Sequence, residues 1–528
     1  MKNKITKFLS LIICICLLCT MIPVHAADSN TDASTNTNIE ETLDNQSDVE
    51  PVPQPLELKG SMYGKRSVLL KWNSDNTNAI YNIYRSTSKD SGFELIDKKT
   101  ELTGDVKYYN ETLTIGTTYY YYIEKELNDE IIATSNTVSV RVRLRPVENI
   151  TVSITSSNKV KLTWDKASYA TSYAIYRSTS KDGEYEQIGA TSKLEYTDAD
   201  VISAKAYYYK IYSWKKGVSS ARSLASEITP AYTKTKKPVV SSKYSSKKVT
   251  LSWSKVTRAE KYYIYRRNSE GTYKKIGETT NLKYTDENIS AKKRYFYKVR
   301  GVYKKDSKNR LGFLCDVHSI YTAAIDPDKK MVAITFDDGP GPHTKAIVNC
   351  LKENNARATF FVVGERIDTY DDELAYTFKY GNEIANHTYS HPNLTKLSKS
   401  KIQSEISKTD KKVQNITGVK TALLRTPGGA TNATVKEVAG KPIIFWSIDT
   451  LDWKHKNASK TVSTVLNNVK DGDIILMHDI HKPTKEAALE LIPKLKKKGY
   501  QIVTVSELAQ YRGYKLKNGT VYSSLRQQ

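Results

Sequence analysis

The sequence predicts a multidomain protein in which three all-β sandwiches precede a distorted (β/α) barrel. At 528 residues, the chain is too long for one hydrophobic core. A tryptophan-bearing strand pattern occurs three times, with Trp72, Trp164 and Trp253 separated by 92 and 89 residues. From Met331 onward, short apolar runs alternate with stretches of helical periodicity. The length requires several domains, the repeat predicts the sandwiches, and the alternation predicts the barrel.

The first 26 residues are predicted to be a signal peptide. Lys2, Lys4 and Lys7 form a basic end, an apolar run follows from Phe8 to Ile22, and a small-residue cleavage signal ends at Ala26. A membrane anchor is the weaker alternative, because the apolar run is shorter than the ~20 residues that span a bilayer. We therefore expect an exported protein, secreted or associated with the cell wall, with no transmembrane segment after cleavage.

Residues 27–52 are predicted to be a disordered acidic tether. The stretch from Ala27 to Leu56 is rich in Ser, Thr and Asn and contains no Lys or Arg. Its acidic residues are Asp28, Asp32, Glu40, Glu41, Asp44, Asp48 and Glu50. Such a composition offers too little apolar surface to form a packed core.

Of the five cysteines, Cys315 and Cys350 remain after the predicted cleavage, because Cys14, Cys16 and Cys19 lie in the signal peptide. An exported chain with so few cysteines is not a disulfide scaffold. The spacing alone leaves open whether the two residues pair, and we expect both thiols to be free.

The formal net charge of +24 indicates an anionic partner. No basic stretch is interleaved with a recognisable nucleic-acid module, so nucleic acid is not expected. For an exported protein, the anionic matrix of a bacterial wall is the better candidate, although basic faces can also serve solubility alone. The oligomeric state does not follow from the sequence.

Each repeated tryptophan ends a strand in which every second residue is apolar. The three strands contain Val68, Leu70 and Trp72; Val160, Leu162 and Trp164; and Val249, Leu251 and Trp253. The stretch Ile83 to Asp90 occurs again, letter for letter, as Ile175 to Asp182. Tyrosine-rich strands follow at Tyr119–Ile123, Tyr207–Ile211 and Tyr295–Val299. Together these strands resemble fibronectin type III domains, which implies three such domains at residues 53–144, 145–232 and 233–325.

Two roles are open for these tyrosine-rich modules. Exposed tyrosine and tryptophan rings could stack on sugars. Alternatively, the rings fill the cores of spacer or wall-binding modules. We favour core filling, because a sandwich of this kind determines a fold and not a function.

Residues 326–528 are predicted to form the barrel. The predicted strands are 332–336, 358–363, 383–386, 422–424, 443–448, 474–477 and 501–505, and helical spacing is found at 344–355, 398–414 and 485–498. Alternating strands and helices of this length favour a parallel sheet that closes, or nearly closes, into a barrel. Polar residues follow five of the seven strands: Asp337 and Asp338; His387 and His391; Arg425; Asp449, Asp452 and Trp453; and His478.

Two of these groups predict a metal site. His387 and His391 are spaced i, i+4, which on a helical turn places both imidazoles on one face. Asp337 and Asp338 are adjacent outside a helix, so one carboxylate can face a metal and the other the reacting water. Two His and one Asp leave coordination positions open, as a catalytic site requires. Each pattern alone is weak evidence, and their combination at one rim is what predicts the site.

The same residues lie in five ordered motifs that resemble the NodB-homology polysaccharide deacetylases, carbohydrate esterase family 4. The motifs are Thr335-Phe-Asp-Asp-Gly-Pro340, His387-Thr-Tyr-Ser-His-Pro392, Arg425-Thr-Pro-Gly-Gly429, Asp449-Thr-Leu-Asp-Trp453 and Leu476-Met-His478. The resemblance covers about residues 326 to 515, and five motifs in order make it specific.

The resemblance implies a role for each residue. Asp338, His387 and His391 would hold a divalent metal, most often Zn²⁺, with Co²⁺ or another transition metal as alternatives. Asp337 would be the general base that Arg425 keeps ionised, and His478 the general acid that Asp452 positions. Trp453 and Leu476 would wall the acetyl pocket. The backbone N–H of Gly428 would donate to the oxyanion where the family often has a tyrosine, so the groove is expected to be more open.

The resemblance also implies a polysaccharide substrate, and we favour N-acetylglucosamine in peptidoglycan. The signal peptide, tether, spacer modules and basic charge suit an enzyme that works at a wall. A chitooligosaccharide deacetylase or an acetyl xylan esterase acting outside the cell is an alternative. A different class of function is a wall-binding or adhesive protein with an inactive deacetylase domain, which the intact acid, base and metal positions disfavour.

Overall fold

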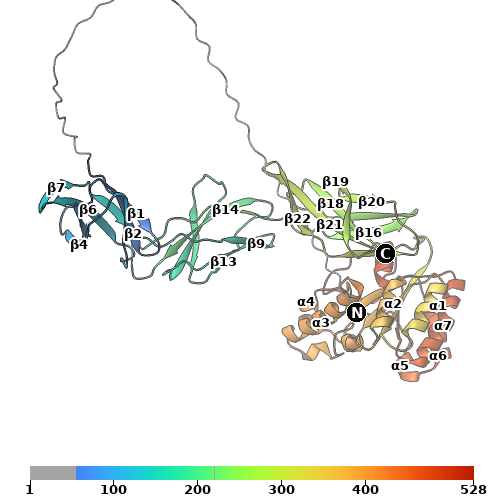
Figure 1. Ribbon diagram of the computed structural model, residues 1–528. Coiled ribbons are helices and arrows are strands. Elements are labelled where there is room, and N and C mark those ends of the chain that lie inside the picture. The colour runs from blue at the N-terminus through green and yellow to red at the C-terminus, as the bar shows by residue number, and fades with distance from the viewer. Residues whose placement is uncertain (1–54, 219–220, 528) are drawn as a thin grey trace, which may run out of the picture. The chain divides into compact units, whose positions relative to one another are not determined.

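The structure is a computed structural model that describes residues 55–218 and 221–527 (Figure 1). The predicted signal peptide and acidic tether lie outside these residues. Within them, no helix is long and apolar enough to cross a membrane. An all-β part comes first along the chain and a mixed α/β part follows, so the predicted order of the two fold types is confirmed.

The first repeat of the all-β part consists of two antiparallel sheets. One sheet has the order β1 (Lys59–Tyr63), β2 (Ser67–Ser74), β5 (Gly104–Asn110). The other has the order β4 (Glu94–Lys99), β3 (Ile80–Ser86), β6 (Thr118–Leu127), β7 (Glu130–Thr134), with β8 (Val138–Arg141) also on β6. The alternating burial of β6 is that of strands with one face on a core.

The second and third repeats have the same plan. In the second, β9 (Thr151–Ser156), β10 (Lys159–Thr163) and β13 (Glu195–Asp198) face β11 (Ser172–Ser178), β12 (Glu186–Thr191), β14 (Ala206–Trp214) and β15 (Thr229–Tyr232). In the third, β16 (Val240–Ser245), β17 (Lys248–Trp253) and β20 (Lys283–Asp286) face β18 (Lys261–Arg267), β19 (Tyr273–Thr279), β21 (Arg294–Lys305), β22 (Lys308–Leu314) and β23 (His318–Tyr321).

Residues that recur in the three repeats form the cores of these repeats. Trp164 packs on Tyr173 and Trp253 on Tyr262, with ring centroids 5.4 and 5.3 Å apart. A polar network also recurs: the hydroxyl of Tyr209 donates to Asp198 Oδ2 at 2.8 Å, and Arg177 pairs with the same carboxylate. The corresponding groups are Tyr297, Asp286 and Arg266 in the third repeat and Tyr121, Asn110 and Arg85 in the first. These tyrosines are therefore core residues.

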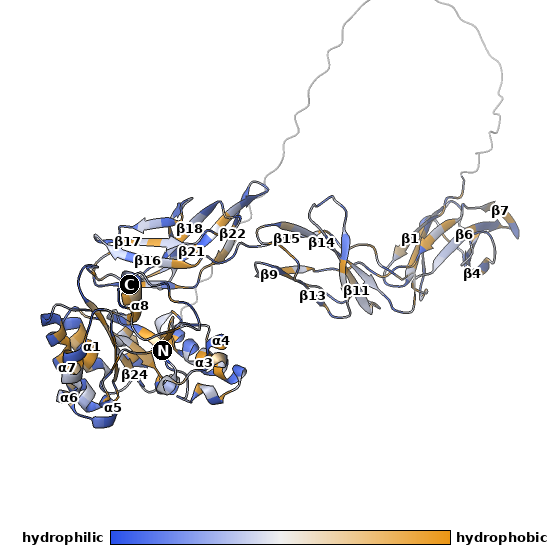
Figure 2. Ribbon diagram, turned by 180° about the vertical axis from the view of Figure 1, so that it is seen from behind, coloured by the Kyte–Doolittle hydropathy of each residue, from blue (hydrophilic) through white to orange (hydrophobic). Residues whose placement is uncertain are grey.

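The α/β part is built on a mostly parallel sheet. Its strand order is β26 (Glu383–Asn386), β25 (Thr359–Val362), β24 (Met331–Asp337), β29 (Ile474–His478), β28 (Ile448–Asp449), and β30 (Gln501–Ile502) pairs with the start of β24. Every residue of β24 is buried. Figure 2 shows the hydrophobic colour of this strand between helices that carry both hydrophobic and hydrophilic residues.

Helices connect and cover these strands. They are α1 (Thr344–Glu353), α2 (Asp371–Lys379), α3 (Lys399–Thr417), α4 (Ala433–Val438), α5 (Asp452–His455), α6 (Ala458–Asn468), α7 (Lys482–Lys497) and α8 (Val505–Tyr511), with short 3₁₀ turns at Gly364–Arg366, Leu394–Lys396 and Pro427–Gly429. The three predicted helical stretches correspond to α1, α3 and α7. The amphipathic pattern identified them, because each buries one apolar stripe on the sheet.

Three predicted strands differ from the structure. The predicted strand 422–424 is present only as single bridges at Leu424, and the strand 443–448 is divided into β27 (Ile443–Ile444) and β28. The strand 501–505 ends early, because Thr504 begins α8 with a capping box to Glu507. In addition, β31 (Val521–Tyr522) pairs with β27. A two-residue strand carries no periodicity, so the sequence offered no signal for it.

Both described cysteines are buried and free, as predicted. The Sγ of Cys315 accepts a hydrogen bond from Val299 N at 3.0 Å. In the first two repeats, the hydroxyls of Ser135 and Ser226 accept the corresponding bond. Cys315 therefore serves the third repeat as a small buried acceptor and not as half of a disulfide.

Arg294 of β21 is one of the residues through which the third repeat contacts the α/β part. Arg294 Nε donates to Phe378 O at 2.9 Å, and its Nη2 donates to Asn382 O at 3.1 Å. The guanidinium also stacks on the Phe378 ring, 3.8 Å from the centroid. Both carbonyls flank the turn between α2 and β26, so the third repeat holds the segment that leads into β26.

Candidate active site

The polar residues predicted at the strand ends do meet in space. Asp337 ends β24 and lies opposite His478 at the end of β29 in the parallel register. His387 follows β26, which lies two strands from β24 on the side away from β29. Asp337 and His478, 141 positions apart (478 − 337), thus face one another, because parallel strands place their carboxyl ends at one edge.

Asp338, His387 and His391 form the one group among the described residues whose ligand atoms could share a metal ion, with those atoms within 4.8 Å of one another. Asp338 Oδ1 lies 3.5 Å from His387 Nε2 and 3.2 Å from His391 Nε2. The helical turn predicted for the two histidines is wrong. They lie in a loop, and positive φ values at Thr388 and His391 bring the rings to a centroid distance of 4.9 Å.

Two features of this group fit a metal. Asp338 Oδ1 is buried, and no hydrogen-bond partner is found for it among the described residues. His387 Nδ1 lies 2.8 Å from Arg425 O, and a carbonyl can only accept, so this nitrogen carries the proton. The lone pair of Nε2 is then free for an ion. Carboxylate and imidazole donors of this kind suit zinc, cobalt and related ions.

Asp337 is held by a fully buried arginine. Arg425 Nη1 donates to Asp337 Oδ1 and to Thr335 Oγ1, each at 2.7 Å, while Nε and Nη2 donate to Ile444 O and Phe445 O. All three nitrogens of the guanidinium are therefore used, and burial lowers the pKa of Arg425, which Asp337 opposes. A cationic donor therefore holds the Asp337 carboxylate in place.

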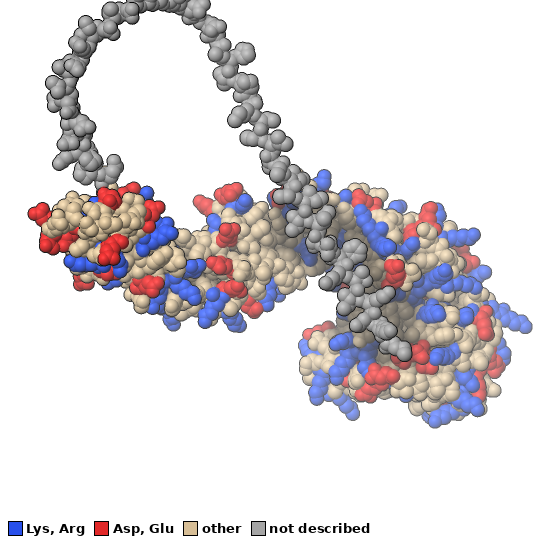
Figure 3. All heavy atoms as spheres, viewed as in Figure 1, with Lys and Arg blue, Asp and Glu red and all other residues tan. Residues whose placement is uncertain are grey.

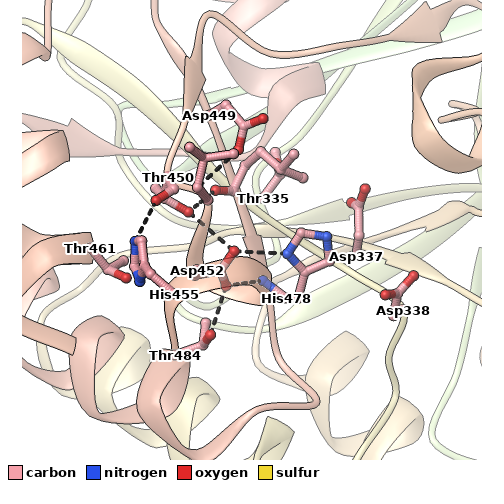
Figure 4. A network of polar contacts seen from close by, with 12 residues as sticks. Thr335, Asp337, Asp338, Asp449, Thr450, Asp452, His455, Thr461, His478 and Thr484 are labelled. Atoms are coloured by element: carbon pink, nitrogen blue, oxygen red, sulfur yellow. Dashed lines mark hydrogen bonds and ion pairs between the residues drawn. The ribbon is translucent and has the colours of Figure 1, made fainter. Parts of the chain in front are cut away.

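Asp452 holds His478 from the side that faces away from Asp337, and Figure 4 shows this network. His478 Nδ1 lies 2.8 Å from Asp452 Oδ1, and His478 N donates to Oδ2 at 2.8 Å. Burial alone lowers the pKa of His478, but the Asp452 carboxylate outweighs it and raises the pKa to about 9. The ring is therefore an imidazolium near neutral pH and can donate from Nε2.

Two threonines of this network were missed by the sequence reasoning. Thr484 Oγ1 donates to Asp452 Oδ2 at 2.6 Å, and Thr450 Oγ1 lies 3.2 Å from Oδ1 and donates to Leu476 O (Figure 4). Thr450 stands inside the fourth motif, so its position was a usable signal. Thr484 lies in α7, outside every motif, and only the fold brings it to Asp452.

The predicted acetyl-pocket residues differ in exposure. Leu476 is buried, whereas Trp453 is 48% exposed and stands at the surface beside Asp452. Gly428 has φ +61°, which suits glycine, and a side chain there would meet no atom within 4 Å. The space directly beside Gly428 is therefore open. Asp449 is exposed and accepts from Leu451 N, so it shapes the turn before α5.

Asp479, next to His478, is a second buried carboxylate that the sequence reasoning did not identify. Thr344 Oγ1 donates to its Oδ2, while Oδ1 lacks a partner among the described residues. A Cβ on Gly339 would lie 2.3 Å from Oδ1, so only glycine fits there. Burial raises the pKa of Asp479 to about 7. The end of β29 is thus packed directly on the loop after Asp338.

Comparison with known proteins identifies the family of this α/β part. The family model described as "Polysaccharide deacetylase" matches residues 324–442. A peptidoglycan-N-acetylglucosamine deacetylase of Bacillus cereus is 36% identical over 201 residues, which are 36% of this chain and 93% of that protein. The chain belongs to the polysaccharide deacetylase family.

Longer members of the family also match. The peptidoglycan-N-acetylmuramic acid deacetylase PdaC of Bacillus subtilis is 37% identical over 220 residues, 41% of this chain and 47% of that protein. The peptidoglycan-N-acetylglucosamine deacetylase PgdA of Listeria monocytogenes is 41% identical over 194 residues, 37% of this chain and 41% of that protein. This chain thus spans about half the length of these two relatives.

Proposed function

We propose that this member of the polysaccharide deacetylase family is a metal-dependent amidase that removes the acetyl group of N-acetylglucosamine in peptidoglycan. One observation carries the proposal. A carboxylate held by Arg425 and an imidazolium held by Asp452 stand on the neighbouring strands β24 and β29, beside the Asp338, His387 and His391 group. A base, an acid and an ion site at one edge are what amide hydrolysis requires.

Each step is assigned to a residue of this chain. When bound by Asp338, His387 and His391, a divalent ion such as Zn²⁺ supplies a Lewis acid that acidifies water and polarises the acetyl carbonyl. Asp337 takes the proton of the attacking water, because its pairing with Arg425 keeps it ionised. The backbone N–H of Gly428 donates to the developing oxyanion.

The remaining steps concern the leaving group. His478 protonates the amide nitrogen, so that an amine leaves instead of an amide anion. Asp452 holds the ring in place and keeps it charged. Trp453 and Leu476 wall the pocket that accepts the acetyl methyl.

The relatives support peptidoglycan as the substrate, since several are named for its deacetylation. They also divide between its two sugars, because the PdaC relative is named for N-acetylmuramic acid. We favour N-acetylglucosamine. A chitooligosaccharide or acetylated xylan substrate and an inactive, wall-binding protein are the alternatives.

The remaining parts of the chain fit an enzyme of the cell wall. We assign a signal peptide to residues 1–26, a tether to 27–52, fibronectin type III domains to 53–144, 145–232 and 233–325, and the deacetylase domain with its distorted (β/α) barrel to 326–528. Lysines and arginines are spread over the visible face of the described parts (Figure 3), which suits an anionic matrix. The protein would therefore act outside the cell, at the wall.

Acetate release tests the activity and the substrate together. Peptidoglycan, chitin oligomers and acetylated xylan are offered side by side, and peptidoglycan sugars are resolved after digestion. We expect release from N-acetylglucosamine of peptidoglycan, and its loss by at least about a hundredfold in Asp337→Asn and in His478→Ala. Dipicolinate should abolish release and added Zn²⁺ restore it.

The exposed Asp328→Asn is the matched control for Asp337→Asn and should keep full activity. Release from xylan alone, or insensitivity to dipicolinate, would contradict the proposal. A folded chain that binds walls but releases no acetate would favour the inactive, wall-binding alternative.

A further inference from the structure

A cavity outside the active site lies where the second and third repeats join. It has a volume of about 650 Å³ and lies between the end of β15, the segment after it, and strands β21 and β22. Its chemically distinctive lining residues are Tyr232, Lys234, Arg300, Tyr303, Arg310 and Phe313. A cavity of this size can hold one or two units of a polymer chain.

The walls of the cavity are held by hydrogen bonds and close contacts with the segment after β15. Strands β21 and β22 shift register between Arg300 and Val302, which opens the pair locally. Phe313 N donates to Thr235 O, and the hydroxyl of Tyr303 donates to Thr233 O at 2.7 Å. A Cβ on Gly312 would lie 1.8 Å from Thr235 Oγ1, so the joining segment crosses β22 in direct contact. The cavity is therefore a built feature of the third repeat.

Lys234, Arg300 and Arg310 line this cavity, and the two arginines have few partners for their charge. Arg300 has a buried Nε without a partner, and no hydrogen bond or ion pair of its side chain is found within the described residues. Arg310 Nε is also buried and unpartnered, and the nearest carboxylate oxygen, on Asp306, is 3.9 Å from Nη2 and belongs to a side chain that is 45% exposed. A buried donor without a partner costs free energy that an anionic ligand recovers.

Aromatic rings stand beside these cations. The guanidinium of Arg310 lies 3.6 Å from the centroid of Tyr232, and the Lys234 ammonium lies 5.0 Å from that of Phe313. Flat rings provide a face for the C–H surface of a sugar or polyol, while the cations take its charged groups. The combination suits a chain in which carbohydrate-like units alternate with anionic groups.

The charge is specific to the third repeat. One backbone hydrogen bond to the central strand recurs in each repeat and identifies equivalent positions. It runs from Ser135 N to Ile123 O, from Ser226 N to Ile211 O and from Cys315 N to Val299 O. The next residue along the strand is Glu124 in the first repeat, Tyr212 in the second and Arg300 in the third. The same fold therefore does not require an arginine here.

We infer that this cavity binds the phosphate groups of a polyol-phosphate or sugar-phosphate polymer. Three cations in one cavity exceed what a single carboxylate neutralises, whereas successive phosphodiesters offer one charge per unit and oxygens that match guanidinium donors. The site would hold the chain on such a polymer close to the α/β part, which the same repeat contacts through Arg294. This inference goes beyond the proposed activity and does not depend on it.

Binding of the full chain to poly(glycerol phosphate) tests the inference, with titration calorimetry at low and at physiological salt. The double variant Arg300→Gln, Arg310→Gln should weaken binding at least tenfold and lower its salt dependence. The control Lys274→Gln, Lys283→Gln removes the same charge from exposed positions of the same repeat and should change affinity less than twofold. Thermal unfolding of each variant checks that the fold is kept.

Two further probes define the ligand chemistry. Neutral dextran should not bind, and poly-glutamate should bind more weakly than the phosphate polymer and respond little to the arginine changes. Equal losses in the arginine and lysine variants would show general charge attraction and overturn the site. Equal, arginine-dependent binding of poly-glutamate would overturn the phosphate assignment, and no binding of the native chain would overturn both.

Discussion

Asp452 determines both the orientation and the charge of His478. Its two oxygens contact the ring Nδ1 and the backbone N of that histidine, and Thr484 donates to the second oxygen. The pKa of Asp452 itself is lowered, since the contacts with His478 outweigh the effect of burial, which raises it. Because both oxygens have hydrogen-bond partners, the carboxylate is fixed and holds the His478 ring in one orientation.

The pH dependence of the rate tests this arrangement. With His478 as the proposed proton donor, kcat should fall as the pH rises through the pKa of His478, which Asp452 raises to about 9. In Asp452→Asn that fall should move to lower pH by at least one unit, because the amide no longer stabilises the imidazolium. The measurement is kcat against pH on a soluble N-acetylglucosamine oligomer.

Thr484→Val is the matched control for this change. It removes one hydrogen bond from Asp452 and keeps the carboxylate charge, so the alkaline fall should shift by much less than in Asp452→Asn. An unchanged profile in Asp452→Asn would show that another group sets the alkaline fall.

Several residues of the proposed site were visible in the sequence, and others were not. The motif letters identified Asp337, Asp338, His387, His478 and Asp452, because the chemistry requires those side chains. Thr484 was missed because its contact with Asp452 spans 32 residues and the hydroxyl has no pattern of its own. A contact of that kind exists only after the elements pack.

At the scale of elements, β29 and the loop after β24 are joined through Asp479. Thr344 Oγ1 accepts from Gly341 N at 2.9 Å and donates to the Asp479 carboxylate. Arg366 Nε donates to Pro340 O at 3.0 Å from the far side of the same loop. The loop that carries Asp338 is therefore held by one strand and one 3₁₀ turn that are distant in sequence.

Asp479 should make stability fall with rising pH. Its pKa is about 7 in the folded chain and ~3.9 when unfolded, so between these values the unfolded chain loses a proton that the folded chain keeps. Asp479→Asn cannot ionise and lacks this loss. From pH 4 to pH 8, the native unfolding free energy should fall by roughly 4 kcal/mol relative to the variant, at ~1.4 kcal/mol per pKa unit.

Urea unfolding measures this difference. The loss of hydrogen-exchange protection in β24 and β29 reports the unfolding. The exposed Asp328→Asn should show no such pH trend relative to the native chain. Parallel curves for the native chain and Asp479→Asn would mean that Asp479 is ionised when folded.

The elements themselves were predicted unevenly. Long amphipathic helices such as α3, and the fully apolar strand β24, carry strong periodic signals. Leu424 and β31 carry none, since one or two paired residues acquire their extended conformation from their neighbours. The i, i+4 spacing of His387 and His391 likewise did not predict the loop that brings them together.

At the scale of the whole described molecule, Arg294 couples the third repeat to the α/β part. Its carbonyl acceptors, Phe378 O and Asn382 O, flank the turn before β26, which leads directly to His387. Burial lowers the pKa of Arg294 to about 10, which still leaves it charged at neutral pH. The Asn382 side chain accepts from Ala358 N, which extends the coupling to the chain before β25.

Removing this guanidinium should loosen the turn. In Arg294→Ala two carbonyls lose charged donors, and we expect a loss of about 1–3 kcal/mol of local stability. Hydrogen exchange of the full chain should then be faster by at least tenfold in peptides that cover residues 377–387. Lys293→Ala, at the exposed residue just before β21, is the control and should leave exchange unchanged.

Slower acetate release without faster exchange in Arg294→Ala would argue against a mechanical coupling. Unchanged exchange in both variants would show that Arg294 does not hold the turn.

The sequence by itself determined the threefold repeat, the alternation of strands and helices, and the set of side chains that the chemistry needs. These features follow from local periodicity and residue type, which are written in the order of the letters. Only the tertiary structure decided that Arg425 is fully buried against Asp337 and that Thr484 contacts Asp452. It also decided that Asp479, at the end of β29, packs on the loop after Asp338, that Arg294 reaches the turn before β26, and that Arg300 lies with other cations in one cavity. Each of these depends on contacts between residues far apart in the chain, and such contacts are set by packing and not by spacing.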